Sequence, residues 1–418
     1  MPGWCWQPRW PSTSACVRCS TTVWTSATPP GHANVGHKAM TLIHSALAGG
    51  DSIDDCDALR AGFTESVLGH CVLAPSTLGT FLRSFTYGHV RQLDKVAAEL
   101  LGRAFAAGAG PGDAAVTIDV DSSIVETYGL KKQGGARFTY NHVRGYHPLV
   151  AVMAGTGDVL HCRQRGGNAN SGRGAGSFLT ETFNRLRAAG ASGALTLRAD
   201  SGFYSGAVAT ACRKAGVRFS ITVRLNKALH NVIAKIPEDA WVPIPYFLDG
   251  GAEVAETTYR PFGKKAPVVR LIVRRVRPTP GSQLALLVDW AYHGFVTDRV
   301  GETVAMEADH RRHAEVENTI RDLKYGVGCN HMPSGRFGAN AAWLAFNVMA
   351  HNLARWTSRL GLGETLIATD TLRRRYLRTP GRVTRSARRL TLHLPRHWPW
   401  AGRFDAALAN LRSVVLVT

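Results

Sequence analysis

One stretch of this chain, residues 116–125, constrains its fold more than any other. Its β-branched residues predict a strand buried on both faces, and Asp119 and Asp121 lie in its middle. Because successive strand side chains alternate, both carboxylates point to the same side of the sheet. Paired charges on a buried strand are costly unless a metal ion or a hydrogen-bond network compensates them. The alternative is an edge-strand end, where both aspartates meet water.

The segments that follow predict a mixed sheet. Strands are expected at residues 147–153, 159–163 and 195–200, and helices at residues 178–189 and from 202 to about 215. In a mixed sheet of this order the first and fourth strands lie side by side. Asp200 ends the fourth strand, so we expect Asp121 and Asp200 to face each other across one metal site.

A β-rich insertion is predicted at residues 219–298, where Pro and Gly punctuate short strands. The strands are expected at residues 219–224, 241–244, 253–259, 268–277 and 284–290. The insertion carries Trp241, Tyr246, Trp290 and Tyr292. Such aromatic residues are usually core residues, but an exposed ring can stack on an unpaired base.

The N-terminal part divides into two unlike segments. Residues 1–34 show no helical or strand period and are assigned no fold; Cys16 and Cys19 have metal-ligand spacing, but no second pair completes a zinc site. Residues 35–110 predict a bundle of short helices. Pattern alone leaves open whether this bundle is a helix-turn-helix type DNA-binding module, with residues 76–83 reading sequence, or an ordinary packing domain.

The charge balance predicts a polyanionic partner. The 418 residues contain 50 Lys and Arg against 30 Asp and Glu, a formal net charge of +20. Residues 371–418 hold 11 arginines and one acid, Asp405, so half of the excess charge lies there. Nucleic acid is the first candidate, bound in a salt-dependent way. No apolar run is long enough to span a membrane, and we expect a soluble protein.

A helix at residues 308–325 is expected to complete the site. Val316, Ile320 and Leu323 form an apolar stripe, and a polar stripe lies about 100° away on an ideal helix. That polar stripe contains His310, His313, Glu317, Arg321 and Lys324. A solvated charged face would explain it equally well. Combined with two strand aspartates upstream, Glu317 becomes a candidate third carboxylate.

These residues resemble a known family. Asp121-Ser122-Ser123, Asp200 at a strand end, and Glu317 with Lys324 seven residues later are similar to the DDE transposases of bacterial insertion sequences, in the branch with a Tyr/Arg/Glu/Lys helix signature. The resemblance covers residues 37–356, and residues 382–400 are similar to the ends of such proteins. His310 stands where Tyr is expected, and His313 where Arg is expected.

The resemblance implies an α/β fold with an RNase-H-like mixed sheet and flanking helices, interrupted by the β-rich insertion and preceded by a helical DNA-binding domain. The implied divisions are residues 1–34 (unassigned), 35–110 (helical domain), 111–218 (first part of the core), 219–298 (insertion), 299–360 (last part of the core) and 361–418 (basic segment).

The resemblance also implies a mechanism. Asp121, Asp200 and Glu317, with Asp119 in reserve for the first acid, would hold two Mg²⁺ ions, for which Mn²⁺ may substitute. Phosphodiesters would be attacked in line, in a cut-and-paste reaction with hairpin DNA ends. Trp241 is the candidate ring for a flipped base. The candidate DNA-contacting residues are Lys324, Arg321, Arg311, Arg312, His310 and His313.

The implied partners are terminal inverted repeats and target DNA, bound by a homodimer in the bacterial cytoplasm in association with the nucleoid. Two alternatives remain open. A catalytically inactive relative would keep only DNA binding, and the His310 and His313 replacements favour that reading. A structure-selective nuclease with the same core would cut branched DNA without joining a 3′ end to a target.

Overall fold

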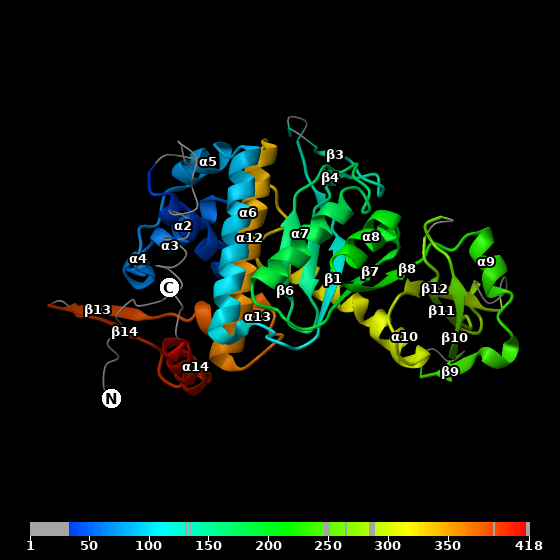
Figure 1. Cartoon of the computed structure of the whole chain (residues 1–418). Coiled ribbons are helices and arrows are strands. Elements are labelled where there is room, and N and C mark those ends of the chain that lie inside the picture. The colour runs from blue at the N-terminus through cyan, green and yellow to red at the C-terminus, as the bar shows by residue number, and fades with distance from the viewer. Residues whose placement is uncertain are drawn as a thin grey trace.

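The computed structural model describes residues 33–129, 132–133, 135–245, 251–263, 266–283, 289–387 and 389–414. Residues 1–32, which include the Cys16 and Cys19 pair, and Tyr246 lie outside this part of the chain. In Figure 1 a group of helices lies at one end of the molecule, a mixed sheet in the middle, and a second group of strands at the other end. None of the described helices is long and apolar enough to cross a membrane.

Short helices form the N-terminal part, as the sequence predicts. Pro75 begins one of them because its fixed φ suits the first helical position. Thr86 and His89 form a capping box that begins the longest, which lies beside α12 of the core. The elements are α2 (Val35–Ala48), η1 (Asp54–Cys56), α3 (Asp57–Arg60), α4 (Thr64–Leu68), α5 (Pro75–Arg83), α6 (Tyr87–Ala104) and η2 (Phe105–Ala109).

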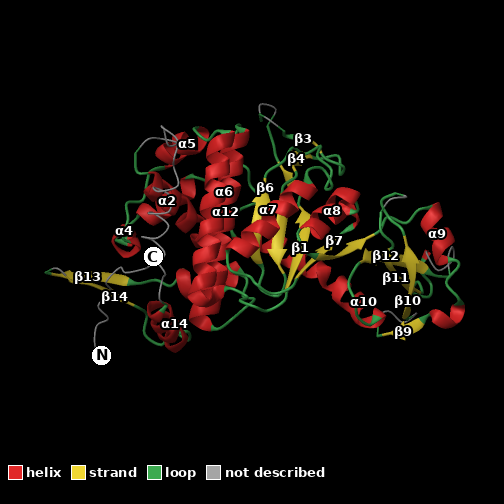
Figure 2. Cartoon of the chain, in the orientation of Figure 1, coloured by secondary structure: helices red, strands yellow, loops and turns green. Residues whose placement is uncertain are grey.

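Five strands form the central sheet in the order β6-β5-β1-β7-β8. They are β1 (Val116–Ser122), β5 (Leu149–Met153), β6 (Asp158–Arg163), β7 (Leu195–Ala199) and β8 (Arg218–Thr222). β5 pairs with β1 and with β6 in antiparallel orientation, and β7 and β8 run parallel to β1. Helices α7 (Ala175–Ala188) and α8 (Gly206–Lys214) connect the parallel strands. This is the expected RNase-H-like mixed sheet, with helices on its faces (Figure 2).

The inserted strands extend this sheet instead of forming a separate one. β12 (Ala291–Thr297), β11 (Val269–Val276), β10 (Ala252–Tyr259) and β9 (Val242–Ile244) follow β8 to give nine strands. Residues 219–222, expected in the insertion, belong to β8 and pair in parallel with β7. A strand was expected at residues 284–290, of which residues 284–288 lie outside the described part. The strand found in this region is β12, which begins at Ala291. Helix α9 (Lys227–Ile233) and η4 (Glu238–Ala240) precede β9.

The chain returns to the core through a helical segment. It comprises α10 (Thr303–Arg311), η6 (Arg312–Glu315), α11 (Val316–Arg321) and η7 (Asp322–Gly326), followed by α12 (Phe337–Thr357) and η8 (Ser358–Leu362). The C-terminal elements are α13 (Thr369–Leu372), η9 (Arg373–Leu377), a ribbon of β13 (Arg382–Ser386) and β14 (Arg389–His393), and α14 (Ala401–Ser413). A small sheet of β2 (Val125–Glu126), β4 (Arg144–Tyr146) and β3 (Arg137–Phe138) follows β1.

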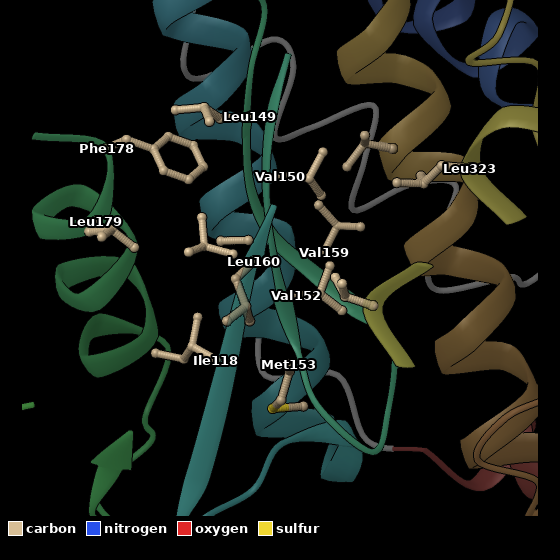
Figure 3. Packing of buried hydrophobic residues seen from close by; sticks show 14 of the residues in the cluster. Ile118, Leu149, Val150, Val152, Met153, Val159, Leu160, Phe178, Leu179 and Leu323 are labelled. Atoms are coloured by element: carbon tan, nitrogen blue, oxygen red, sulfur yellow. The ribbon is translucent and has the colours of Figure 1, made fainter. Parts of the chain in front are cut away.

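The two faces of the central sheet are covered differently. Ile118 of β1 and Leu160 of β6 point toward Phe178 and Leu179 of α7 (Figure 3). On the opposite face, Val150 and Val152 of β5 lie toward Leu323 of η7 (Figure 3). In the antiparallel register Val150 is the partner of Asp121 and Val152 the partner of Asp119. Both β1 aspartates therefore point to the face that the 303–326 segment covers.

Candidate active site

Strand register brings Asp121 and Asp200 together. Asp119 pairs with Arg198, and Val120 with Ala199, in the parallel β1–β7 ladder. The next position in this register places Asp200 beside Asp121, on the same face as Asp119 and Arg198. Asp200 caps the short helix η3 (Ser201–Phe203) by accepting a hydrogen bond of 2.9 Å from the Gly202 amide.

Glu317 of α11 reaches the same place. Burial and the charges of Asp200 and Glu317 raise the pKa of Asp121 to about 6, while His313 acts in the opposite direction. The three carboxylates therefore lie within electrostatic range of one another, although they come from positions 121, 200 and 317. We call Asp121, Asp200 and Glu317 the acidic site. Val316 and Leu323 are buried on the neighbouring stripe of the segment, as its apolar pattern predicts.

Lys324 is the cation of this group. Burial lowers the pKa of Lys324, and the charge of Asp121 partly offsets that decrease. Its ammonium group therefore lies near the first carboxylate. Glu317 and Asp200 are solvent-exposed, so the acidic site is open on one side. Like charges that meet at an open site, with a single lysine nearby, retain a negative potential that attracts cations.

The possible ligand atoms of the acidic site are spread more widely than those of a second group of residues elsewhere. Among the described residues, the one group of three possible metal ligands whose ligand atoms all lie within 4.8 Å of one another is Asp94, His161 and Glu181. No sequence motif indicates this group, because its members come from the separate elements α6, β6 and α7. Three arginines already pair with its two carboxylates: Arg91 with both, Arg185 with Asp94, and Arg163 with Glu181. This compensation disfavours a further cation.

Asp119 has a structural role, which corrects its place as the reserve catalytic acid. Its side chain is almost completely buried, and both carboxylate oxygens accept hydrogen bonds of 2.8 Å from Arg198. The Arg198 guanidinium also donates to Asp309 of α10, at 2.6 Å to the backbone oxygen and 3.1 Å to the carboxylate. Asp309 pairs further with Arg299. We call Asp119, Arg198, Asp309 and Arg299 the arginine node.

His310 does not share a face with Glu317, although the ideal helix places both on one stripe. Its two ring nitrogens lie 2.7 and 2.9 Å from the hydroxyls of Ser220 and Thr222 on β8, and its ring stacks on Phe295. Burial and nearby cations lower the pKa of His310 to about 3, so the ring is neutral. The 3₁₀ segment η6 turns 120° per residue, which breaks the expected stripe.

His313 lies closer to the carboxylates. Its Nε2 donates a hydrogen bond of 3.2 Å to the carbonyl oxygen of Val120, the residue between Asp119 and Asp121. The charge of His313 lowers the pKa of both aspartates against the effect of burial. In the described structure this residue contacts the first strand, and a DNA contact by the same ring would compete with that hydrogen bond.

The remaining predicted DNA contacts lie in different environments. Arg321 is exposed and donates to Asn318, while Arg312 pairs with Glu315 and Arg311 with Glu307. Trp241 is 9% exposed and lies against Arg275, with 4.3 Å between the guanidinium carbon and the ring centroid, and against Tyr292. Because the ring packs in the core of the insertion, it offers no face for a flipped base. This corrects the choice of Trp241.

Comparisons with known proteins give a family for most of the chain. Residues 32–416 match the model of a family described as transposase DDE domain, group 1. No curated protein matches the chain. Among solved structures, the chain is similar to a piggyBac transposase in a synaptic complex with hairpin DNA, determined by cryo-electron microscopy, with 14% identity over 88% of this chain and 79% of that chain and a TM-score of 0.47.

Proposed function

This chain belongs to the DDE transposase family, and we propose that it binds the terminal inverted repeats of a bacterial insertion sequence, cleaves them and joins their 3′ ends to target DNA. One observation carries the proposal. Asp121, Asp200 and Glu317 lie within electrostatic range of one another on the RNase-H-like sheet, with Lys324 beside Asp121. Three carboxylates with so little compensation destabilise the protein unless a cation binds them.

The residues of the acidic site fit divalent metal ions, whose use the family implies. Burial and the charges of Asp200 and Glu317 raise the pKa of Asp121, and carboxylate oxygens are the ligands that Mg²⁺ prefers, with Mn²⁺ as its substitute. Asp121, Asp200 and Glu317 would hold two such ions. When bound, the pair stabilises the attacking and the leaving oxygens of the phosphodiester. Lys324 would contact a phosphate beside the carboxylates, which positions the strand without reading its sequence.

The basic C-terminal ribbon supports DNA binding. Arg382, Arg385 and Arg389 are exposed on β13 and β14, and within the described residues none of them has an ion-pair partner. The two strands pack mainly against each other, and the ribbon projects from the body of the molecule (Figure 1). Free guanidinium groups on such a ribbon attract phosphates and make binding salt-dependent. We propose that this ribbon holds DNA outside the acidic site.

The finer steps of the reaction rest on the family resemblance. We propose cut-and-paste movement with hairpin DNA ends, carried out by at least two copies of the chain, because transposition brings two DNA ends together. The localisation that fits this reaction is the bacterial cytoplasm, at the nucleoid. The piggyBac complex with hairpin DNA is a property of that protein. Denaturing gels of cleaved ends distinguish hairpins from open ends by their size.

A strand-cleavage assay tests the function. The probe is duplex DNA that ends in the terminal repeat of the element, with Mg²⁺ or Mn²⁺, and the variants are Asp200→Asn and Glu317→Gln. Because metal-assisted charge stabilisation is worth several kcal/mol, we expect each variant to lose about 1,000-fold in cleavage rate. DNA binding should change less than threefold. Retained cleavage in both variants would contradict the assignment.

The same assay separates the two alternatives. An inactive DNA-binding relative would bind the repeat but leave it uncut with either metal. A structure-selective nuclease would cut branched DNA and give no joined product when a supercoiled target is added. His310→Tyr introduces the Tyr that the family signature has at this position, and it serves as the control for that difference. Its ring sits between Ser220, Thr222 and Phe295, so we expect this change to affect stability more than DNA affinity.

A further inference from the structure

Several exposed aromatic side chains lie on or next to the small sheet that follows β1. Among the described residues, six aromatic side chains are strongly exposed: Phe63, Tyr87, Tyr128, Phe138, Tyr140 and Tyr325. Three of them, at positions 128, 138 and 140, lie on or next to the small sheet β2-β4-β3, with 79, 71 and 72% of their surface exposed. Large exposed rings that occur close together along a short segment indicate an interaction site.

The small sheet holds these rings on a fixed backbone. β4 pairs with β2 on one side and with β3 on the other, and Phe138 lies opposite Arg144. Tyr140 follows in a turn that Thr139 closes by bonding twice to Val143. Residues 147–148 connect β4 directly to β5, and β5 pairs with β1. The small sheet is therefore attached to the central sheet. Phe138 and Tyr140 are therefore exposed without being on a free loop.

Contacts connect this sheet to the catalytic acids. The ring of Tyr140 lies 5.8 Å from the ring of His147, which is buried and donates from Nδ1 to the carbonyl oxygen of Ala169. The charge of Asp200 acts on His147 against the decrease in pKa that burial causes. Tyr140 and Asp200 thus both lie near one imidazole.

The charge of the surface suits a nucleic acid. Arg137, next to Phe138, is exposed and has no ion-pair partner among the described residues. Arg144 adds a second guanidinium, against one acid, Glu126. Aromatic rings beside an exposed arginine such as Arg137 suit single-stranded nucleic acids, because each base stacks through its face and the guanidinium contacts a phosphate. A duplex keeps its bases stacked internally and offers no such face.

We propose that Tyr128, Phe138 and Tyr140 stack on unpaired bases of the DNA end that lies in the acidic site, with Arg137 at the adjoining phosphate. This proposal rests on the proposed function for the identity of the DNA. It assigns to the small sheet the base-holding role that was expected of the insertion. The rings would keep a separated strand away from its complement while the scissile phosphate lies at the carboxylates.

Equilibrium binding to two labelled DNAs tests the proposal. One is a blunt duplex, and the other is the same duplex with five unpaired thymidines at its end; both are measured by fluorescence anisotropy with EDTA present, so that no strand is cut. We expect the wild-type chain to prefer the tailed duplex. Phe138→Ala and Tyr140→Ala should each weaken tailed-duplex binding by about tenfold and change blunt-duplex binding less than twofold.

Two further variants complete the test. Phe63→Ala removes an exposed ring from the helical part and should leave the ratio of the two affinities unchanged. Phe138→Trp should restore tailed-duplex binding, because the larger ring also stacks. Equal losses on both DNAs, or a change in oligomeric state on gel filtration, would overturn the proposal and assign the rings to a duplex or to a second copy. If the repeat is never cleaved but the tail preference follows the rings, the proposed function fails and the stacking surface stands.

Discussion

The arginine node and the acidic site share three parts of the chain, and only Arg299 of the node lies outside them. β1 supplies Asp119 to the node and Asp121 to the site; β7 supplies Arg198, and Asp200 follows directly after its end; and the 303–326 segment supplies Asp309 and Glu317. On each strand the two residues are two positions apart and therefore share one face. The node lies in the buried interior of this face, and the site lies at its open end.

The two groups differ in charge compensation. In the node one buried guanidinium bonds to both neighbouring elements, so the charges cancel and the strands are held in register. In the acidic site three acids meet with one lysine, and repulsion adds to burial in raising the pKa of Asp121. Neighbouring acids on one strand therefore have opposite environments: the charge of Asp119 is compensated by Arg198, whereas Asp121 lies near two further acids.

Arg198→Met is expected to have the largest effect on stability. It removes the guanidinium and leaves the buried carboxylate of Asp119 without its partner, whereas Asp309 keeps its ion pair with Arg299. Breaking a buried ion pair in this way typically costs about 3–5 kcal/mol. Urea unfolding measures the loss. The double variant Arg198→Met with Asp119→Leu should recover part of it, because an apolar replacement of both partners leaves no buried charge. A loss below about 1 kcal/mol would show that the node does not hold the strands.

The same substitution at two neighbouring positions sharpens the comparison. Asp119→Asn is expected to lower the free energy of unfolding by about 2 kcal/mol, because Arg198 loses a charged partner. Asp121→Asn should leave stability unchanged or raise it slightly in metal-free buffer, because one of the repelling charges is removed. Thermal unfolding of both variants measures the difference. Equal destabilisation by the two changes would mean that Asp121 is compensated in the native protein too.

The pH dependence of stability tests a third acid, Asp322, whose charge is compensated by its hydrogen-bond partners. It accepts hydrogen bonds from Thr369 at 2.8 and 2.9 Å and from Arg355 at 3.1 Å. Burial acts to raise its pKa, but His351, Arg355 and Thr369 outweigh burial and lower the pKa to about 2. Ionised Asp322 therefore contributes stability above its unfolded pKa of 3.8, and this contribution is lost as the pH falls through about 2.

The expected contribution of Asp322 is about 2 kcal/mol. Urea unfolding between pH 5 and pH 2 should show a smaller acid-induced loss for Asp322→Asn than for the wild-type chain. Asp405→Asn, in the C-terminal helix, is the control and should keep the wild-type pH dependence. If the two variants lose stability in parallel as the pH falls, the carboxylate of Asp322 is not the titrating group.

Much of the fold follows from local patterns. The β-branched strand at 116–122 and the strand ending at Asp200 are read directly from sequence, and the strand order places Asp121 beside Asp200. The parallel register between β1 and β7 confirms that order. The strand of residues 291–297 was missed because Gly294 weakens its strand pattern and Trp290 and the residues before it look more like a strand.

The failures share one physical cause, which is that partners distant in sequence decide burial. Asp119 looks as reactive as Asp121 until Arg198, 79 residues away, pairs with it. Trp241 looks like a free ring until Arg275 and Tyr292 cover it. The polar stripe of residues 310–324 assumes an unbroken α-helix, whereas the 3₁₀ turn η6 redirects His310 to β8. The catalytic roles of Asp121, Asp200 and Glu317 stay a prediction until cleavage is measured.

The smallest expected effect tests where a metal ion binds. A ligand that binds only the folded state stabilises it by about 1.4 kcal/mol at a concentration ten times its dissociation constant. Mn²⁺ added to EDTA-treated protein should therefore raise the melting temperature of the wild-type chain, and Asp121→Asn should lose this increase. Asp94→Asn is the matched control from the compensated group of Asp94, His161 and Glu181, where the arginines oppose a cation. If the increase survives in Asp121→Asn and disappears in Asp94→Asn, the metal binds the compensated group, and the contrast between open and compensated acids fails.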